Sequence, residues 1–268
     1  PSTDYSKVGP WWASFGDYAD RNIYGVVNTA QTEDTVSDWP PEVAQHSFAS
    51  EGLTPWPEGA ALEDQDFTHF IVTPPNFVQE DPTDYPAGRW AGYVNEFIDD
   101  IREVSADIEG FIYIACQEPF VSGGYPDDAH LVGDEIDDYA DYVENEYLDW
   151  HIAEYDLIRS ARPDINLRMI PAGPAIFKLW LNASWLQTME WTDLFVDASP
   201  HGADTFYFLA ALVTDRVVRG ETLDLSNYEF PAGSNVAEEV RNNLVATYTR
   251  LVTILDDYEQ DGVMRVYS

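Results

Sequence analysis

The sequence predicts an α/β protein in which a mostly parallel sheet carries helices on both faces. Short apolar runs that are typical of buried strands occur at residues 67–73, 111–116 and 167–173. Longer segments with apolar residues at helical spacing lie between and after these runs, at residues 93–108, 136–161, 206–218 and 236–258. Strands that alternate with helices along a chain imply parallel pairing, with a helical layer on each face of the sheet.

The predicted elements have recognisable boundaries. Within residues 93–108, apolar side chains recur at positions 94, 97, 98, 101 and 104, which is the spacing of one helical face. The acidic segment 136–161 ends shortly before Pro163, because proline disfavours helical backbone in the residue that precedes it. The strand at residues 111–116 lies between Gly110 and Pro119. Residues 195–197 are expected to end a fourth strand before the helix at 206–218.

The first 66 residues are rich in Pro, Gly, Trp and acidic residues, and we expect them to be rich in loops. One apolar run, Ile23 to Val27, predicts a strand. The segment from Ser37 to Pro41 is typical of a helix start and predicts a helix over residues 42–48. Because no linker or internal repeat divides the chain, residues 1–268 are expected to form a single domain, with residues 67–268 as its α/β core.

The charge of the chain is extreme. It contains 49 Asp and Glu residues against 13 Lys and Arg residues, which gives a formal net charge of -36. Nucleic acid and anionic membrane surfaces are therefore not expected as partners, since binding them requires a positive field. The acids are dispersed, and Lys7 and Lys178 are the only lysines. This composition resembles that of halophilic proteins, in which molar salt screens the repulsion. Secretion and a high-salt cytoplasm both remain open as locations.

The sequence does not predict a metal site, a reactive cysteine or a membrane-spanning segment. The five histidines share no H-x-H or H-x-x-x-H spacing, and the paired acids are typical of solvated surfaces, so no metal or other cofactor is predicted. Cys116 is the only cysteine and follows an apolar run, which favours a buried, inert thiol. No run of about 18 apolar residues suggests a membrane span.

Polar residues follow several predicted strands at the ends where open parallel sheets bind ligands. They are Asn28 and Thr29, Asn76, Gln117 and Glu118, Gly173, and the pair Asp197 and His201. We place His201 at the centre of the candidate site, because an imidazole acts as a general base near neutral pH and a nearby carboxylate can orient it. Asp197 can equally serve only to accept hydrogen bonds from backbone amides of the turn.

Two segments carry a resemblance to a known family. The run VDASPHGADTFYFLAALV, residues 196–213, is similar to the last block of the SGNH (GDSL-type) hydrolases, in which D-x-x-H places an acid and the catalytic histidine before a C-terminal helix. The run TPPNF, residues 73–77, is similar to their Gly-x-Asn block. The resemblance extends over about residues 67–258 and implies a three-layer α/β/α fold.

The resemblance implies a hydrolase of small ester or acetyl groups, possibly on a carbohydrate. In this reading His201 is the general base, Asp197 orients it, and the Asn76 amide stabilises the oxyanion. The alternative for Asn76 is an Asx turn without a catalytic role. The family's Gly-Asp-Ser block has no counterpart here, so the nucleophile stays open between Thr29, the leading candidate, and Ser14.

The chain also departs from the family pattern in two other places. Pro74 replaces the glycine of the Gly-x-Asn block, and Asp197 lies four residues before His201 where the family has three. A catalytically degenerate relative that binds a glycan or a partner protein is therefore an alternative, supported by the many tryptophans of the early segment. A second alternative is a (β/α)8 glycosidase that uses Glu118, within Gln117-Glu118-Pro119, as acid/base.

Overall fold

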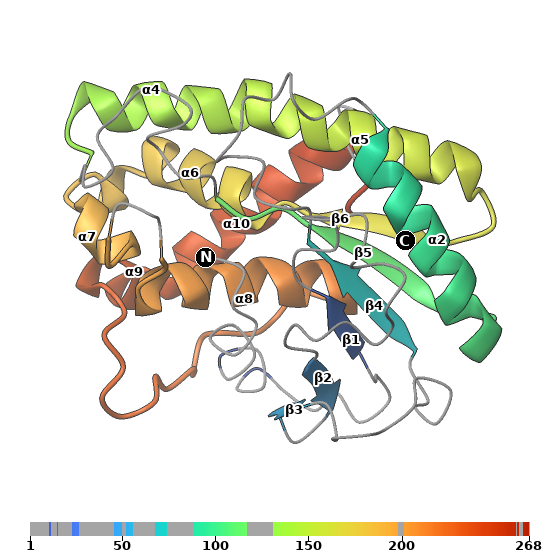
Figure 1. The fold of residues 1–268 in the computed structure, drawn as a ribbon. Coiled ribbons are helices and arrows are strands. Elements are labelled where there is room, and N and C mark those ends of the chain that lie inside the picture. Colours follow the sequence, from blue (N-terminus) through green and yellow to red (C-terminus); the bar gives the residue numbers. More distant parts are fainter. Residues whose placement is uncertain are drawn as a thin grey trace.

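The computed structural model contains a six-stranded sheet with the strand order β3-β2-β1-β4-β5-β6 (Figure 1). Its strands are β1 (Ile23–Val26), β2 (His46–Ala49), β3 (Gly52–Pro55), β4 (His69–Val72), β5 (Glu109–Tyr113) and β6 (Leu167–Ile170). The pairs β1 with β4, β4 with β5, and β5 with β6 are parallel. The prediction of a mostly parallel sheet in an α/β fold is therefore confirmed. The structure describes residues 11, 15, 23–26, 46–49, 52–55, 68–73, 88–116, 131–197, 201–260, 262 and 265–267.

Strands β1, β2 and β3 come from the first 66 residues and join the same sheet as the later strands. The predicted strand at Ile23 is confirmed as β1, which ends at Val26. The helix expected over residues 42–48 is wrong for residues 46–48, because residues 46–49 form β2. Residues 42–45 lie outside the described residues. Strand β2 is antiparallel to both β1 and β3, so pairing across the sheet outweighs the local helix-start signal. The single-domain organisation stays a prediction.

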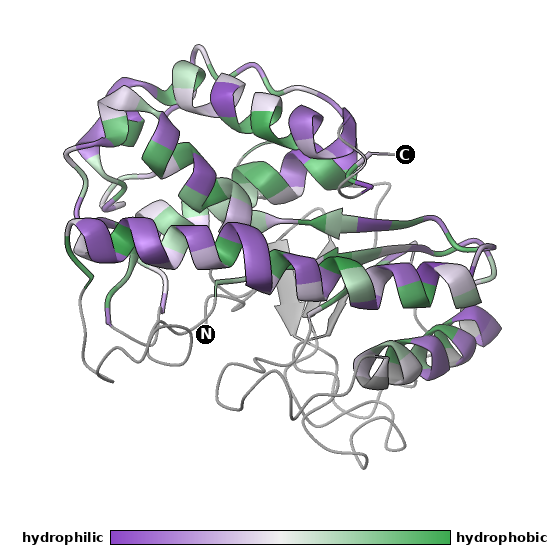
Figure 2. Ribbon diagram, turned by 90° about the horizontal axis from the view of Figure 1, so that it is seen from above, coloured by the Kyte–Doolittle hydropathy of each residue, from purple (hydrophilic) through white to green (hydrophobic). Residues whose placement is uncertain are grey.

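Among residues 67–268, helices occur in each segment where the sequence predicts one, but the helix expected over 93–108 already ends at Val104, the one expected over 236–258 is interrupted at Asn243, and further helices are present. The helices of the described residues are α2 (Arg89–Val104), α4 (Asp134–Tyr142), the π-helical segment η4 (Val143–Tyr147), α5 (Leu148–Ala161), α6 (Ala172–Asn182), the short 3-10 helix η5 (Ser184–Leu186), α7 (Trp191–Leu194), α8 (Asp204–Arg219), α9 (Glu238–Asn242) and α10 (Leu244–Gln260). Figure 2 shows hydrophilic and hydrophobic residues interspersed along them, as expected where one side of a helix is buried.

Contacts from alternate residues of the strands show that helices cover both faces of the sheet. On one face, the ring of Phe70 packs edge-on against Phe97 of α2, with 5.2 Å between centroids. The Tyr155 hydroxyl of α5 donates to the carbonyl of Leu167 on the same side (3.1 Å). On the opposite face, the Arg168 guanidinium donates to the carbonyl of Val217 in α8 (2.8 Å). Successive strand residues point to opposite faces of a sheet. Helices α2 and α5 therefore lie on one face of the sheet and α8 lies on the other (Figure 1).

The expected fourth strand at residues 195–197 is wrong. Residues 191–194 form the helical turn α7, and Phe195 makes only an isolated antiparallel bridge with Gly202. A capping box between Glu190 and Asp193 starts this turn. The Trp191 and Phe195 rings then pack together with 4.4 Å between centroids, in a buried aromatic cluster. The apolar character of this segment therefore reflects packing between helices and not a strand.

The strand predicted at residues 167–173 is shorter than expected. It ends at Ile170, and the unpredicted helix α6 begins at Ala172. Gly173 therefore lies in the first turn of α6, where an added Cβ would stand 2.2 Å from the carbonyl oxygen of Ala115. Proline is tolerated in a first helical turn, which explains how Pro174 fits there. Gly173 is thus a position of close packing between α6 and the end of β5.

Two further points limit the possible architectures. The strands of the described residues form an open sheet with β3 and β6 at its ends, whereas the glycosidase alternative requires a closed barrel of parallel strands. None of the described helices combines the length and the apolar composition needed to cross a membrane.

Candidate functional site

The candidate site centres on the turn between α7 and α8, which backbone hydrogen bonds close. The Val196 amide donates to the carbonyl of His201 (2.8 Å), and the Ala203 amide donates to the carbonyl of Leu194 (2.7 Å). These bonds belong to the bridge between Phe195 and Gly202. Because the bridge joins the chain on both sides of the turn, the ends of the segment that carries Asp197 and His201 are fixed.

Asp197 and His201 form a close pair within this turn. The distance between Asp197 Oδ2 and His201 Nδ1 is 2.5 Å. The second carboxylate oxygen, Oδ1, accepts a hydrogen bond from the His201 backbone amide at 3.1 Å. The carbonyl of Asp197 in turn accepts a hydrogen bond from the indole Nε1 of the buried Trp191 (3.3 Å). Asp197 is therefore held by its backbone and fixes both the main chain and the ring of His201.

The geometry of the pair defines what the imidazole can do. With Nδ1 directed at the carboxylate, the neutral ring carries its proton there, and Nε2 is the nitrogen that can accept a proton. The His201 and Asp197 side chains are 46% and 45% exposed, so small molecules can reach the ring. An ion pair with this exposure contributes only about 0–1 kcal/mol to stability. The pair therefore contributes little to the stability of the fold.

The turn lies toward the carboxyl ends of the parallel strands. Arg168, near the start of β6, bonds to Val217 near the C-terminus of α8. Helix α8 thus runs antiparallel to β6, and its 16 residues span about 24 Å, much more than the four-residue strand. Its N-terminus, which follows His201, consequently extends beyond the carboxyl end of β6. Ligands of open α/β sheets bind on that side.

The remaining predicted site residues, Thr29 and Asn76, lie outside the residues that the structure describes, as does Glu118 of the glycosidase alternative. The strands that precede the first two are neighbours, since β1 and β4 pair in parallel with Val26 opposite Val72. In the sequence, Thr29 comes three residues after the end of β1 and Asn76 comes four residues after the end of β4.

Cys116, just after β5, is buried. Burial raises the pKa of its thiol well above the ordinary value, so the thiol stays protonated near neutral pH. This is the environment predicted for an inert cysteine. Among the described residues, no group of three or more His, Cys, Asp and Glu side chains is arranged to hold a metal ion.

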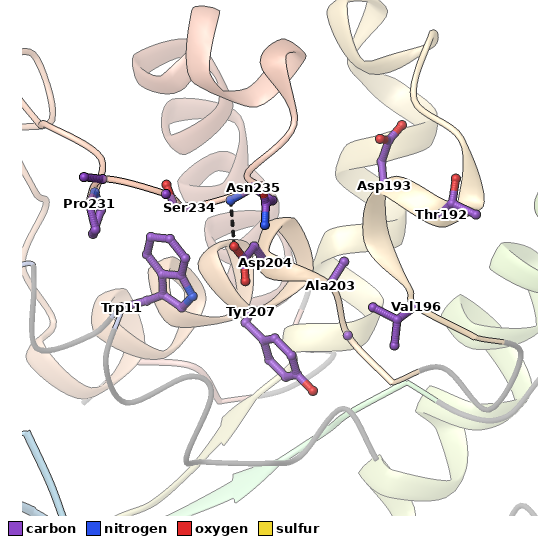
Figure 3. Close-up of a pocket in the computed structure, with 13 residues that line it drawn as sticks. Trp11, Thr192, Asp193, Val196, Ala203, Asp204, Tyr207, Pro231, Ser234 and Asn235 are labelled. Carbon is purple, nitrogen blue, oxygen red and sulfur yellow. Dashed lines mark hydrogen bonds between the residues drawn. The ribbon is translucent and has the colours of Figure 1, made fainter.

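A cleft of about 700 Å³ adjoins the turn (Figure 3). Its lining comes from the start of α8, from α7, from Trp11 and from a loop that follows α8: Trp11, Thr192, Asp193, Val196, Gly202, Ala203, Asp204, Tyr207 and residues 231–235. His201 is not part of this lining, but its chain neighbour Gly202 and its backbone partner Val196 are. The turn that carries His201 therefore adjoins the cleft through Val196 and Gly202, and the volume of the cleft is typical of ligand sites.

The sequence did not reveal this cleft. Asp204 anchors the distant loop, because its Oδ2 accepts a hydrogen bond from the backbone amide of Asn235 (2.7 Å). The Thr205 hydroxyl accepts another from the Ala237 amide (2.9 Å). The cluster Pro231-Ala-Gly-Ser-Asn235 is a recognisable loop signal. Nothing in its composition indicates that it returns to the start of α8, roughly 30 residues earlier in the chain.

Comparisons with protein-family models, with curated proteins and with solved structures found no match for this chain.

Proposed function

We propose that the chain is an SGNH-like hydrolase of small ester or acetyl groups, with His201 as general base and Asp197 as the acid that orients it. The observation that carries this proposal is the 2.5 Å contact between Asp197 Oδ2 and His201 Nδ1 beside an accessible cleft. A spacing of four residues between acid and histidine differs from the family's three. It nevertheless produces the acid-to-Nδ1 contact that acyl transfer requires.

The proposed reaction is acyl transfer through a protein hydroxyl. Nε2 of His201 removes the proton from that hydroxyl, whose oxygen bonds to the acyl carbon and gives a tetrahedral oxyanion. The bond from this carbon to the alcohol oxygen then breaks, and the alcohol leaves with the proton from His201. Water attacks the acyl-enzyme by the same steps and releases the acid. Thr29 is the leading candidate for the hydroxyl and Asn76 for the oxyanion donor, since they follow the neighbouring strands β1 and β4.

A binding protein without catalysis is the second candidate function. The observation that favours it is the cleft itself, which combines Trp11 and Tyr207 with the polar side chains of Ser234 and Asn235. Aromatic rings beside amide and hydroxyl groups suit the mixed apolar and polar faces of a sugar. In this case the pair of Asp197 and His201 would serve only to order the turn.

Ester hydrolysis by the wild-type protein and its His201→Ala variant separates the two functions. With p-nitrophenyl acetate and an acetylated saccharide as substrates, the variant should lose at least about 10²-fold in kcat, because general base catalysis typically contributes 10²–10⁴. His69→Ala is the matched control, since His69 is also partly exposed but lies at the amino end of β4. Absence of activity in the wild type at every salt concentration, or full activity in His201→Ala, would favour the binding protein.

A further inference from the structure

Trp191, the first residue of α7, is held in place by the aromatic rings around it. Its side chain is 2% exposed. The ring centroid lies 4.4 Å from that of Phe195, 5.8 Å from that of Tyr139 in α4 and 6.4 Å from that of Phe177 in α6. In a close-packed interior, a side chain of this size cannot rotate unless its neighbours move. The packing therefore fixes the direction in which the indole N–H points.

The backbone of α7 is fixed as well. The Glu190 amide donates to Asp193 Oδ2 at 2.8 Å, as part of the capping box that starts the turn. The Asp193 amide donates to the carbonyl of Glu190 at 3.0 Å, and the Phe195 amide donates to the carbonyl of Trp191 at 2.9 Å. Trp191 is thus anchored by its main chain and by its ring.

The indole N–H connects this anchored residue to the proposed base. Its nitrogen lies 3.3 Å from the carbonyl oxygen of Asp197, at the long end of the range for such bonds. The carboxylate of the same Asp197 contacts both the backbone amide and the ring Nδ1 of His201. The carbonyl carbon and the side chain of Asp197 share one Cα atom. A bond that holds the carbonyl therefore also restricts where the carboxylate can lie.

From this chain of contacts we propose that Trp191 is a positioning residue for His201. Its indole N–H holds the Asp197 main chain so that the carboxylate keeps the ring proton on Nδ1 and leaves Nε2 to accept a proton. The importance of this role for catalysis rests on the proposed function. The tautomer of the ring, however, can be measured without turnover.

Replacement of Trp191 by benzothienylalanine tests the proposal, because a sulfur then takes the place of the N–H while the ring keeps its shape. NMR of protein with isotope-labelled histidine ring nitrogens, at about pH 9 where histidine is usually neutral, shows which nitrogen carries the proton. The His201 signals are those that disappear in His201→Ala. The Nδ1–H form should dominate in the wild type. Its ratio to the Nε2–H form should fall about two- to fivefold in the replaced protein, and fivefold equals the ~1 kcal/mol of one neutral hydrogen bond.

Catalysis should change in the same direction. If the N–H orients the base, kcat for p-nitrophenyl acetate falls by about two- to fivefold while KM stays within about twofold, because the substrate does not contact the indole N–H.

Two controls separate positioning from packing. The same replacement at Trp185 removes an indole N–H that donates to the Thr247 hydroxyl (3.1 Å), away from the turn, and should leave the His201 tautomer ratio and kcat unchanged. In an Asp197→Ala background, the replacement at Trp191 should have no further effect, since two residues that act through one contact are not additive.

The proposal is overturned if the replacement at Trp191 leaves the tautomer ratio unchanged, if the replacement at Trp185 changes it equally, or if the effect persists in Asp197→Ala. The last two results would assign the effect to packing of the indole rings or to a route that bypasses Asp197. Failure of the proposed function gives a different pattern, in which the wild type lacks esterase activity while the tautomer ratio still responds to the loss of the Trp191 N–H.

Discussion

Acidification should destabilise the protein through His151, which is buried in α5 with 1% of its surface exposed. Burial lowers the pKa of His151 from 6.5 to about 4, although a hydrogen bond of 2.7 Å between its Nδ1 and the carbonyl of Tyr147 partly opposes the shift. The folded state therefore keeps the ring neutral at a pH where the unfolded chain protonates it. The contribution to stability is fully present above pH 6.5 and is lost as the pH falls through 4.

The size of the effect follows from the two pKa values. Between about pH 7 and about pH 5, preferential proton binding by the unfolded state should lower the free energy of unfolding by about 2 kcal/mol. Below about pH 4 the full loss approaches ~3 kcal/mol. The Asp and Glu residues titrate in part of the same range, so the wild type alone cannot isolate this contribution.

Comparison of the wild type with His151→Asn isolates the contribution of His151 to the pH dependence of stability, because asparagine keeps a donor near the position of Nδ1 and does not titrate. Urea denaturation at both pH values, at constant salt, gives the pH-dependent change in the free energy of unfolding for each protein. The change should be smaller in the variant by about 2 kcal/mol. Equal changes in the two proteins would show that His151 is not held neutral by burial, and would refute the reasoning.

Two other predictions concern stability. The net charge of -36 should make the melting temperature higher in about 2 M KCl than in about 0.05 M, because the Debye length falls to about 3 Å near 1 M salt; an unchanged melting temperature in calorimetric scans would contradict this. Gly173→Ala should destabilise the fold by about 1–3 kcal/mol in urea denaturation, since its Cβ would clash with the Ala115 carbonyl. The control Gly92→Ala, where a Cβ meets no atom within 4 Å, should be neutral or stabilising, and equal losses at both sites would contradict the packing argument.

The sequence predicts those parts of the fold in which a short run of apolar residues corresponds to a buried strand. Strands β4 and β5 consist largely of buried residues, and their apolar runs mark them. Helix α6 escaped prediction because it is buried on nearly every side and so lacks the periodicity of a surface helix. The prolines at 171 and 174 also resemble a strand end followed by a loop. Strand β2 depends on pairing with segments on both sides, which local composition does not encode.

The candidate site likewise has one part that the sequence predicts and one part that it does not. Asp197 and His201 lie four residues apart in one turn, so their contact follows from local chain geometry and could be anticipated. The cleft beside them depends on Asp204 binding the amide of Asn235, a long-range contact that no local pattern predicts. The sequence therefore predicted the proposed base and its acid, but not the cleft that adjoins their turn.

Labelling with a fluorophosphonate tests the central claim most directly, since the oxygen of a hydroxyl group that a neighbouring base activates attacks its phosphorus, displaces fluoride and becomes phosphonylated. Mass spectrometry of the labelled protein and its peptides should show one modified Ser or Thr in the wild type, with Thr29 as the leading candidate. The modification should be lost in His201→Ala and retained in His69→Ala. Absence of labelling in the wild type at low and molar salt, or equal labelling in His201→Ala, would contradict catalysis by the Asp197 and His201 pair.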